Sequence, residues 1–221
     1  MKLLVNALVK YISGLLLVGL LMFLPAGDFG YKNGWLFICL LFLPMLVLGV
    51  VLFCKAPSLL GKRLLTKEKE KTQQLVVRLS ALMFVSGFII AGLDYRFGWT
   101  DVCLTAVIIA SALLILSYGM YAEVMRENAY LSRTITVQEG QRIIDTGLYG
   151  IVRHPMYLAT VVLFLSIPIV LGSWLSFLCF LPYVVLIAIR ILNEEKLLEE
   201  SLEGYAEYKR KVKYRLIPFL W

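Results

Sequence analysis

The sequence predicts an all-α integral membrane protein with about six transmembrane helices, a C-terminal helical hairpin and a cytosolic amphipathic tail helix. Hydrophobic residues make up 60% of the 221 residues, against roughly 45–50% in typical soluble domains. Long apolar runs recur along the chain, and Lys and Arg gather in alternate loops between them. Together these observations indicate a single membrane domain over residues 1–221.

Four spans are expected in the first half of the chain. The runs Gly34–Cys54 and Val102–Ala122 contain no charged residue and match the roughly 20 residues that cross a hydrocarbon core. The runs Leu3–Leu24 and Leu75–Leu93 are each interrupted by one basic residue. We interpret the first as a retained span, because it lacks the small-residue cleavage site of a signal peptide.

The second half, residues 123–221, contains nearly all the clustered polar residues, whereas residues 1–122 contain few. The apolar run Pro155–Ile189 is too long for one crossing and a little short for two. Gly172 and Ser173 offer a turn near its middle, so we expect two short helices in a tight hairpin. The total is then six spans, or five if one of them is re-entrant.

The segment Glu194–Lys213 predicts the tail helix. Leu198, Leu202, Tyr205 and Val212 recur there at helical spacing among Glu and Lys residues. Gly204 weakens the pattern and is a candidate position for a bend. Two alternatives stay open for this helix. It lies on the membrane surface, or it covers a pocket on the cytosolic side.

The distribution of basic residues predicts the orientation of the chain. Lys and Arg crowd the segments 55–74 and 123–154 and the C-terminal tail, whereas the intervening loops contain little beyond Lys32 and Arg96. Because positive loops face the cytosol, both termini are expected there. The net charge of +7 then lies mainly against anionic headgroups. Nucleic acid is not an expected partner, since the basic residues follow the membrane topology.

Two polar clusters bracket the predicted hairpin and predict a ligand site. Arg153 and His154 precede Pro155, which suits the first position of a helix, and a helix N-terminus beside basic groups suits a carboxylate. Anchoring at headgroup level explains these residues equally well. At the other end, Arg190 and Glu194 share a helical face. They form an ion pair with a snorkelling arginine, or they hold an anionic and a cationic or hydroxyl-bearing ligand group, respectively.

Three neighbouring features complete this interpretation. Glu195 points to another side, toward the same ligand or toward water. Residues 145–150 predict a turn and not a phosphate-binding loop, because no GxGxxG pattern or preceding strand accompanies them. The four cysteines have no CxxC spacing and no nearby histidine, so neither a metal site nor a disulfide framework is expected.

Three segments carry a resemblance to a known family: TGLYGIVRHPMYLA at 146–159, LGSW at 171–174 and NEEKLLEESLEGYAEYKRKVKYRLIP at 193–218. They resemble the isoprenylcysteine carboxyl methyltransferase family, with its bacterial branch closest, within the wider group that includes phospholipid N-methyltransferases. The likeness extends to LPAGDFGYKNGW and LDYRFGW in the first half, which are less specific. Leu148 and Ala159 depart from the pattern, where proline and glycine are common.

The resemblance implies S-adenosylmethionine as cofactor, an amphiphilic or lipid-linked acceptor of isoprenylcysteine type, and a bacterial inner membrane as the favoured location. It assigns Arg190 to the substrate, as the catalytic residue. It assigns these residues to the cofactor: Gln141, Arg142, Ile143, Ile144, Tyr149, His154, Pro155, Met156, Tyr157 and Glu194. A carboxylate acceptor is ionised at neutral pH, so it needs alignment and exclusion of water but no general base.

Two other classes of function stay open. NADPH-dependent membrane sterol reductases share RHP-like and Y…IP elements, although the short TGLY and the NEEKLL spacing favour a methyltransferase. A non-enzymatic transporter or scaffold would use the polar pairs as a conduit. Transporters often have two corresponding halves with broken helices, whereas here the polar residues lie in one half and on one face.

Overall fold

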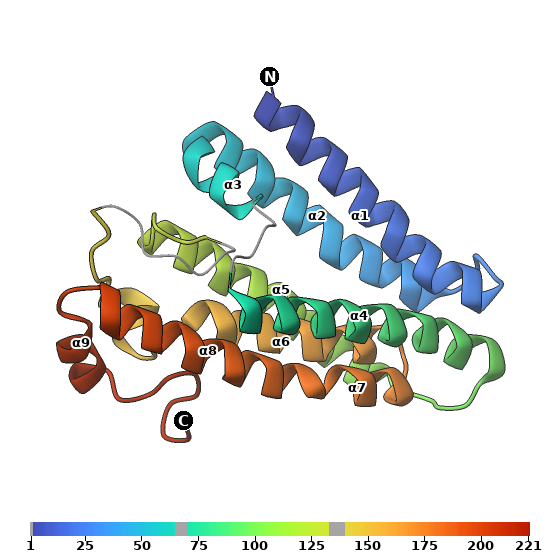
Figure 1. Cartoon of the computed structure of the whole chain (residues 1–221). Coiled ribbons are helices and arrows are strands. Elements are labelled where there is room, and N and C mark those ends of the chain that lie inside the picture. The colour runs from blue at the N-terminus through green and yellow to red at the C-terminus, as the bar shows by residue number, and fades with distance from the viewer. Residues whose placement is uncertain (1, 65–69, 133–139) are drawn as a thin grey trace.

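The computed structural model (Figure 1) describes residues 2–64, 70–132 and 140–221, and every regular element within these ranges is a helix. The elements in chain order are α1 Lys2–Ala26, α2 Lys32–Lys55, α3 Pro57–Arg63, α4 Lys71–Phe97, α5 Leu104–Glu127, the 3-10 turn η1 Gly147–Gly150, α6 Pro155–Val170, α7 Trp174–Phe180, α8 Pro182–Ser201 and α9 Tyr205–Lys211. The predicted all-α class is therefore confirmed.

Among the described residues, five helical segments are long and apolar enough to cross a membrane: α1, α2, α4, α5 and the stretch Trp174–Ser201, which contains α7 and α8. The first four lie where the apolar runs of the sequence predict spans. Helix α6 is shorter, with 16 residues, or about 24 Å at 1.5 Å per residue. The hydrocarbon core of a bilayer is about 30 Å thick, so α6 is a short apolar helix packed among longer ones.

Helices α4 to α8 form the bundle that positions the site. Helix α5 packs along α6, and α4 packs against α1, α7 and α8, while α1 and α2 cross the bundle at an angle (Figure 1). The crossing of α1 and α4 is close, because a Cβ atom added at Gly92 would lie 2.4 Å from the carbonyl oxygen of Met22. A residue without a side chain at this point lets the two backbones touch.

The hairpin turns at Gly172 and Ser173, as the sequence predicts, and Gly172 has a φ of 79° that favours glycine. The Ser173 hydroxyl accepts the backbone N–H of Ser176 at 3.0 Å and donates to the buried carboxylate of Asp94 in α4. That carboxylate also accepts the backbone N–H of Thr100 at 2.7 Å and its hydroxyl at 2.5 Å. These bonds fix the turn against the C-terminal end of α4.

The tail segment Glu194–Lys213 is divided into two helical parts next to Gly204, the residue that the sequence marks as a weak point and a bend. Residues 194–201 continue α8, and a separate short helix, α9, begins at Tyr205. Helix α8 ends at Ser201 because its C-cap residue Leu202 is extended, and Gly204, with a left-handed φ of 82°, is the N-cap residue of α9. The turn brings the chain back against Ile143, whose Cδ1 would lie 3.2 Å from a Cβ added at Gly204. The tail therefore covers the segment around Ile143.

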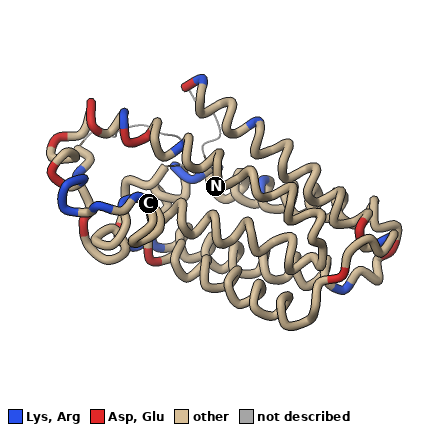
Figure 2. The backbone as a smooth tube through the Cα atoms, turned by 90° about the horizontal axis from the view of Figure 1, so that it is seen from below, with Lys and Arg blue, Asp and Glu red and all other residues tan. Residues whose placement is uncertain are grey.

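Lys and Arg residues gather along the backbone at one end of the molecule (Figure 2), the end at which Figure 1 labels α3 and α9. We call it the basic end, and it comprises α3, residues 128–132 and 140–150, α9 and the tail as far as Arg215. The acidic and basic residues of the opposite end are fewer (Figure 2). The alternate loops that are rich in Lys and Arg in the sequence therefore lie together at one end of the folded chain.

We expect Gly92→Ala to destabilise the protein, because its added methyl group would meet the α1 backbone at Met22, which moves only if the two helices separate. Overpacking of this kind costs about 1–3 kcal/mol. Gly119→Ala is the matched control, since Gly119 is helical and exposed, with no atom within 4 Å of an added Cβ. Thermal unfolding of both variants in detergent checks this, and equal Tm values would contradict it.

Candidate active site

A cavity of about 440 Å³ lies at the basic end. Its polar part is formed by residues 128–132 and 141–157, the C-terminal half of α8 and α9. Its apolar part lies between α4, α6 and α8, where Phe84, Phe164 and Ile187 line it. A volume of this order, with apolar walls and a few polar groups, is typical of sites for small molecules.

The cavity brings together all the residues that the sequence assigns to a ligand. These residues are Gln141, Arg142, Ile143, Ile144, Tyr149, His154, Pro155, Met156, Tyr157, Arg190 and Glu194. They come from separate segments of the chain, so it is the fold that makes them neighbours. Which ligand group each of them binds stays a prediction.

The start of α6 has the local structure that the sequence predicts. The helix begins at Pro155, with His154 in the N-cap position. The backbone N–H groups of Arg153 and His154 donate to the carbonyl oxygens of Tyr214 and Arg215, both at 2.9 Å, so the tail runs beside this helix end. The side chains of Arg153 and His154 are buried, which does not fit the alternative that they anchor the chain at headgroup level.

Glu195 is the charged residue that the sequence analysis misjudges. It is only 3% exposed. Its Oε1 atom accepts a bond from Arg153 Nε at 2.7 Å and lies 3.2 Å from His154 Nε2. Its Oε2 atom accepts a bond from Arg215 Nε at 2.9 Å. The expectation that Glu195 faces the ligand or water is therefore wrong, because three basic side chains enclose its carboxylate.

Arg153 joins this carboxylate to the tail. Besides Glu195, its guanidinium donates from Nη1 to the carbonyl oxygens of Val212 at 2.7 Å and Lys213 at 2.9 Å. A buried charge is tolerated only when it is paired and its remaining hydrogen-bonding groups are satisfied. Arg153 meets this condition through partners on α8 and on the tail, so it holds the cavity wall together.

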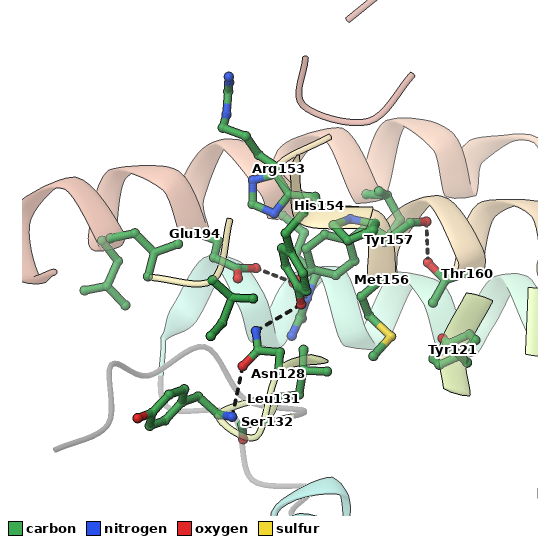
Figure 3. Close-up of a pocket in the computed structure, with 18 of the residues that line it drawn as sticks. Tyr121, Asn128, Leu131, Ser132, Arg153, His154, Met156, Tyr157, Thr160 and Glu194 are labelled. Atoms are coloured by element: carbon green, nitrogen blue, oxygen red, sulfur yellow. Dashed lines mark hydrogen bonds between the residues drawn. The ribbon is translucent and has the colours of Figure 1, made fainter. Parts of the chain in front are cut away.

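Tyr157 connects the two residues of α8 that the sequence places on one face. Its hydroxyl donates to Glu194 Oε2 at 2.5 Å and accepts a bond from Arg190 Nε at 3.0 Å. Figure 3 shows the Glu194 carboxylate pointing toward this hydroxyl. The sequence predicts that Arg190 and Glu194 share a helical face, but it gives no signal for a tyrosine of α6 between them.

A second set of bonds fixes the turn before α6. The Tyr149 hydroxyl accepts a bond from Asn128 Nδ2 at 3.0 Å, drawn in Figure 3, and its carbonyl oxygen accepts the Tyr208 hydroxyl at 2.8 Å. Burial raises the pKa of the Tyr149 hydroxyl, which therefore stays protonated. Asn128 and Tyr208 line the cavity but were not predicted, because a single asparagine and a tail tyrosine form no recognisable pattern.

The described lining contains more cationic than anionic groups. Arg63 of α3, Arg142 and Arg190 line the cavity, with Glu194 as the acidic residue among them. The charge of Arg153 is already balanced by Glu195 behind the wall. A cavity of this balance attracts ligands that carry a negatively charged group.

The fold and the cavity define a class of protein: a helical membrane protein with a polar site at one end of its bundle, continued by an apolar arm between the helices. Comparison with known families narrows this class. Residues 103–204 match the family described as phospholipid methyltransferase. The predicted resemblance to membrane methyltransferases is thereby confirmed over this stretch, and it indicates a membrane methyltransferase.

A curated relative points in a second direction. The mouse delta(14)-sterol reductase is 31% identical to this chain over 91 residues. The match covers 40% of this chain but only 22% of the reductase. The match shows that the two proteins share a segment of similar sequence. It is too short to assign the activity of the reductase to this chain.

We expect Glu195→Ala to cause a large loss of stability, since it leaves Arg153 buried without its carboxylate. Breaking one partner of a buried pair costs about 3–5 kcal/mol. Glu199→Ala is the matched control on the same helix, because its partner is the partly exposed Lys209 and surface pairs contribute about 0–1 kcal/mol. Thermal unfolding in detergent measures both, and a Glu195→Ala variant as stable as Glu199→Ala would contradict the central role of this carboxylate.

Proposed function

We propose that this protein is an S-adenosylmethionine-dependent methyltransferase of the membrane that acts on an amphiphilic acceptor at the cytosolic face, with a carboxylate of isoprenylcysteine type favoured. The observation that carries the proposal is the continuity of one cavity. Its polar end contains Tyr157, Arg190 and Glu194, and its apolar arm extends between α4, α6 and α8. A water-soluble methyl donor and a lipid acceptor can meet only where a polar site and an apolar site are continuous.

The residues present suit the proposed cofactor. When bound, S-adenosylmethionine supplies an electrophilic methyl group on a positively charged sulfonium. Glu194 offers a carboxylate to a cationic group, and Arg142 offers a cation to a carboxylate. Ile143 and Ile144 provide apolar surface beside them. This donor set fits a zwitterionic amino acid joined to a nucleoside.

Arg190 is the residue we assign to the acceptor. It lies where the polar part of the cavity meets the apolar part, one helical turn from Ile187. Its guanidinium can orient a carboxylate, which is ionised at neutral pH and needs no general base. The residues then contribute by aligning the acceptor oxygen and excluding water. An amine acceptor would first have to lose a proton, and an arginine beside it would oppose binding of its charged form.

The proposed orientation rests on charge. The basic end carries α3, α9 and a concentration of Lys and Arg residues (Figure 2), and positively charged loops remain on the cytosolic side of membranes. Both termini would then lie in the cytosol, and the cavity would receive its cofactor from there. The bilayer is the partner that covers the exposed apolar faces of the helices.

A second candidate is an NADPH-dependent reductase acting on a sterol-like lipid. Two observations favour it: the 31% identity to the mouse delta(14)-sterol reductase over part of the chain, and three of the arginines in the cavity lining, Arg63, Arg142 and Arg190, besides Arg153, which is paired with Glu195. Arginine clusters suit phosphate groups. The family match at residues 103–204 places the methyltransferase first.

Cofactor binding by the purified protein in detergent separates the two candidates. We expect titration calorimetry to detect S-adenosylhomocysteine, which keeps the amino-acid and nucleoside parts of the donor, and no binding of NADPH. The Glu194→Ala variant is the control for specific binding in the cavity. NADPH binding without S-adenosylhomocysteine binding would reverse the order of the two candidates.

We expect Arg190→Ala to lose methyl transfer while it keeps most of its cofactor affinity, and Glu194→Ala to lose cofactor affinity, because we assign the two residues to different ligands. Loss of one charge-assisted hydrogen bond, about 1.5–3 kcal/mol, corresponds to a roughly 10- to 150-fold weaker Kd for Glu194→Ala. Radiolabelled methyl transfer into a total lipid and membrane-protein extract measures activity and identifies the acceptor class.

Arg78→Ala is the matched control, because Arg78 is an exposed arginine in the apolar part of α4 and outside the cavity lining. It should keep both activity and affinity. Weakened cofactor binding by Arg190→Ala, together with unchanged binding by Glu194→Ala, would show that the two roles are assigned the wrong way round.

A further inference from the structure

Tyr205 is the tyrosine of the cavity wall whose hydroxyl has no partner among the described residues. Its side chain is 4% exposed and lines the cavity, and its buried hydroxyl oxygen makes no hydrogen bond. The hydroxyls of Tyr149, Tyr157 and Tyr208 are all bonded. Because a buried polar group without a partner is costly, this hydroxyl indicates a partner that the described residues do not supply.

The surroundings of Tyr205 are apolar. It packs in one cluster with Tyr208 and Val212, against Ile143 and Leu198, and several of these side chains also line the cavity. The Tyr205 ring thus has apolar neighbours, and its hydroxyl is the hydrogen-bonding group of this cluster that has no partner among the described residues. A flat heterocycle fits these surroundings, because its faces are apolar and its edge is polar.

The chemical state of the hydroxyl limits the partner further. Burial, and then the negative charges of Glu195 and Glu194, raise the pKa of the Tyr205 hydroxyl. It therefore stays protonated and can donate one hydrogen bond. Ring nitrogen atoms at the edge of a purine are acceptors that match this donor.

The fold holds Tyr205 in place from both sides. The left-handed Gly204 turns the chain so that Tyr205 becomes the first residue of α9. Three residues on, the Tyr208 hydroxyl ties α9 to the carbonyl oxygen of Tyr149. Lys211, at the end of α9, pairs with Asp145 at 2.5 Å. The unbonded hydroxyl is therefore fixed in position by neighbours that are bonded.

We propose that α9 forms an adenine-binding subsite, in which the Tyr205 hydroxyl donates a hydrogen bond to the base of the bound cofactor. This inference rests on the proposed function, because it supposes a cofactor that contains adenosine. It adds a binding residue that lies outside the stretch matched by the family, residues 103–204.

The test compares Tyr205→Phe with wild type in detergent, using S-adenosylhomocysteine and 5′-deoxy-5′-methylthioadenosine, which keeps the nucleoside but lacks the amino-acid part. Loss of one hydrogen bond between neutral groups should weaken both ligands roughly three- to tenfold. The Tm of ligand-free Tyr205→Phe should equal or exceed that of wild type, because the substitution removes an unsatisfied buried hydroxyl. Tyr208→Phe, which loses a satisfied bond, should have a lower Tm.

Unchanged affinity of Tyr205→Phe for both ligands would overturn the inference. So would a loss confined to S-adenosylhomocysteine, since the hydroxyl would then contact the amino-acid part. If wild type binds NADPH and not S-adenosylhomocysteine, the proposed function fails. The affinities of Tyr205→Phe and wild type for NADPH, which also contains adenosine, then decide whether the adenine subsite exists. If wild type binds none of these compounds, both proposals fail.

Discussion

The buried carboxylate of Glu195 is the constraint on which the site depends. Removing a carboxylate from water is expensive, and the cost is offset only when charged partners surround it in good geometry. Here those partners are Arg153 and His154 at the start of α6, and Arg215 in the tail. Because Glu195 itself belongs to α8, one charge draws three segments, distant in sequence, to a common point behind the cavity wall.

The contacts of Glu195 also determine the geometry of the cavity. With Arg153 and His154 held by Glu195 and by backbone bonds to the tail, the first turn of α6 has a fixed orientation. Tyr157, one turn on, then meets α8 between Arg190 and Glu194. Residues that contact a ligand are held accurately when their own neighbours are fixed. Glu195 and Arg215, which are outside the cavity lining, therefore position Arg153 and His154, which belong to it.

The sequence predicts the spans well and the site in part. Apolar length alone locates α1, α2, α4 and α5, and helical spacing places Arg190 and Glu194 on one face. The burial of Glu195 could not be found in this way, because it stands in a run of acidic and apolar residues typical of a solvated helix. Its partner Arg215 lies beyond the turn at Gly204, and periodicity does not report how two helices meet across such a turn.

Some residues of the cavity lie inside the stretch that matches the family, and others lie outside it. The stretch 103–204 covers α5 to α8, which provide Tyr157, Arg190 and Glu194. Helices α3, α4 and α9 complete the cavity from outside that stretch, with Arg63, Phe84 and Tyr205. The family match and the partial identity to a sterol reductase each cover less than half of the chain, so neither accounts for the residues that close the cavity. Under the proposed function, Arg63, Phe84 and Tyr205 are therefore where we expect the choice of donor and acceptor to be made, because they complete a cavity whose remaining walls come from the matched stretch.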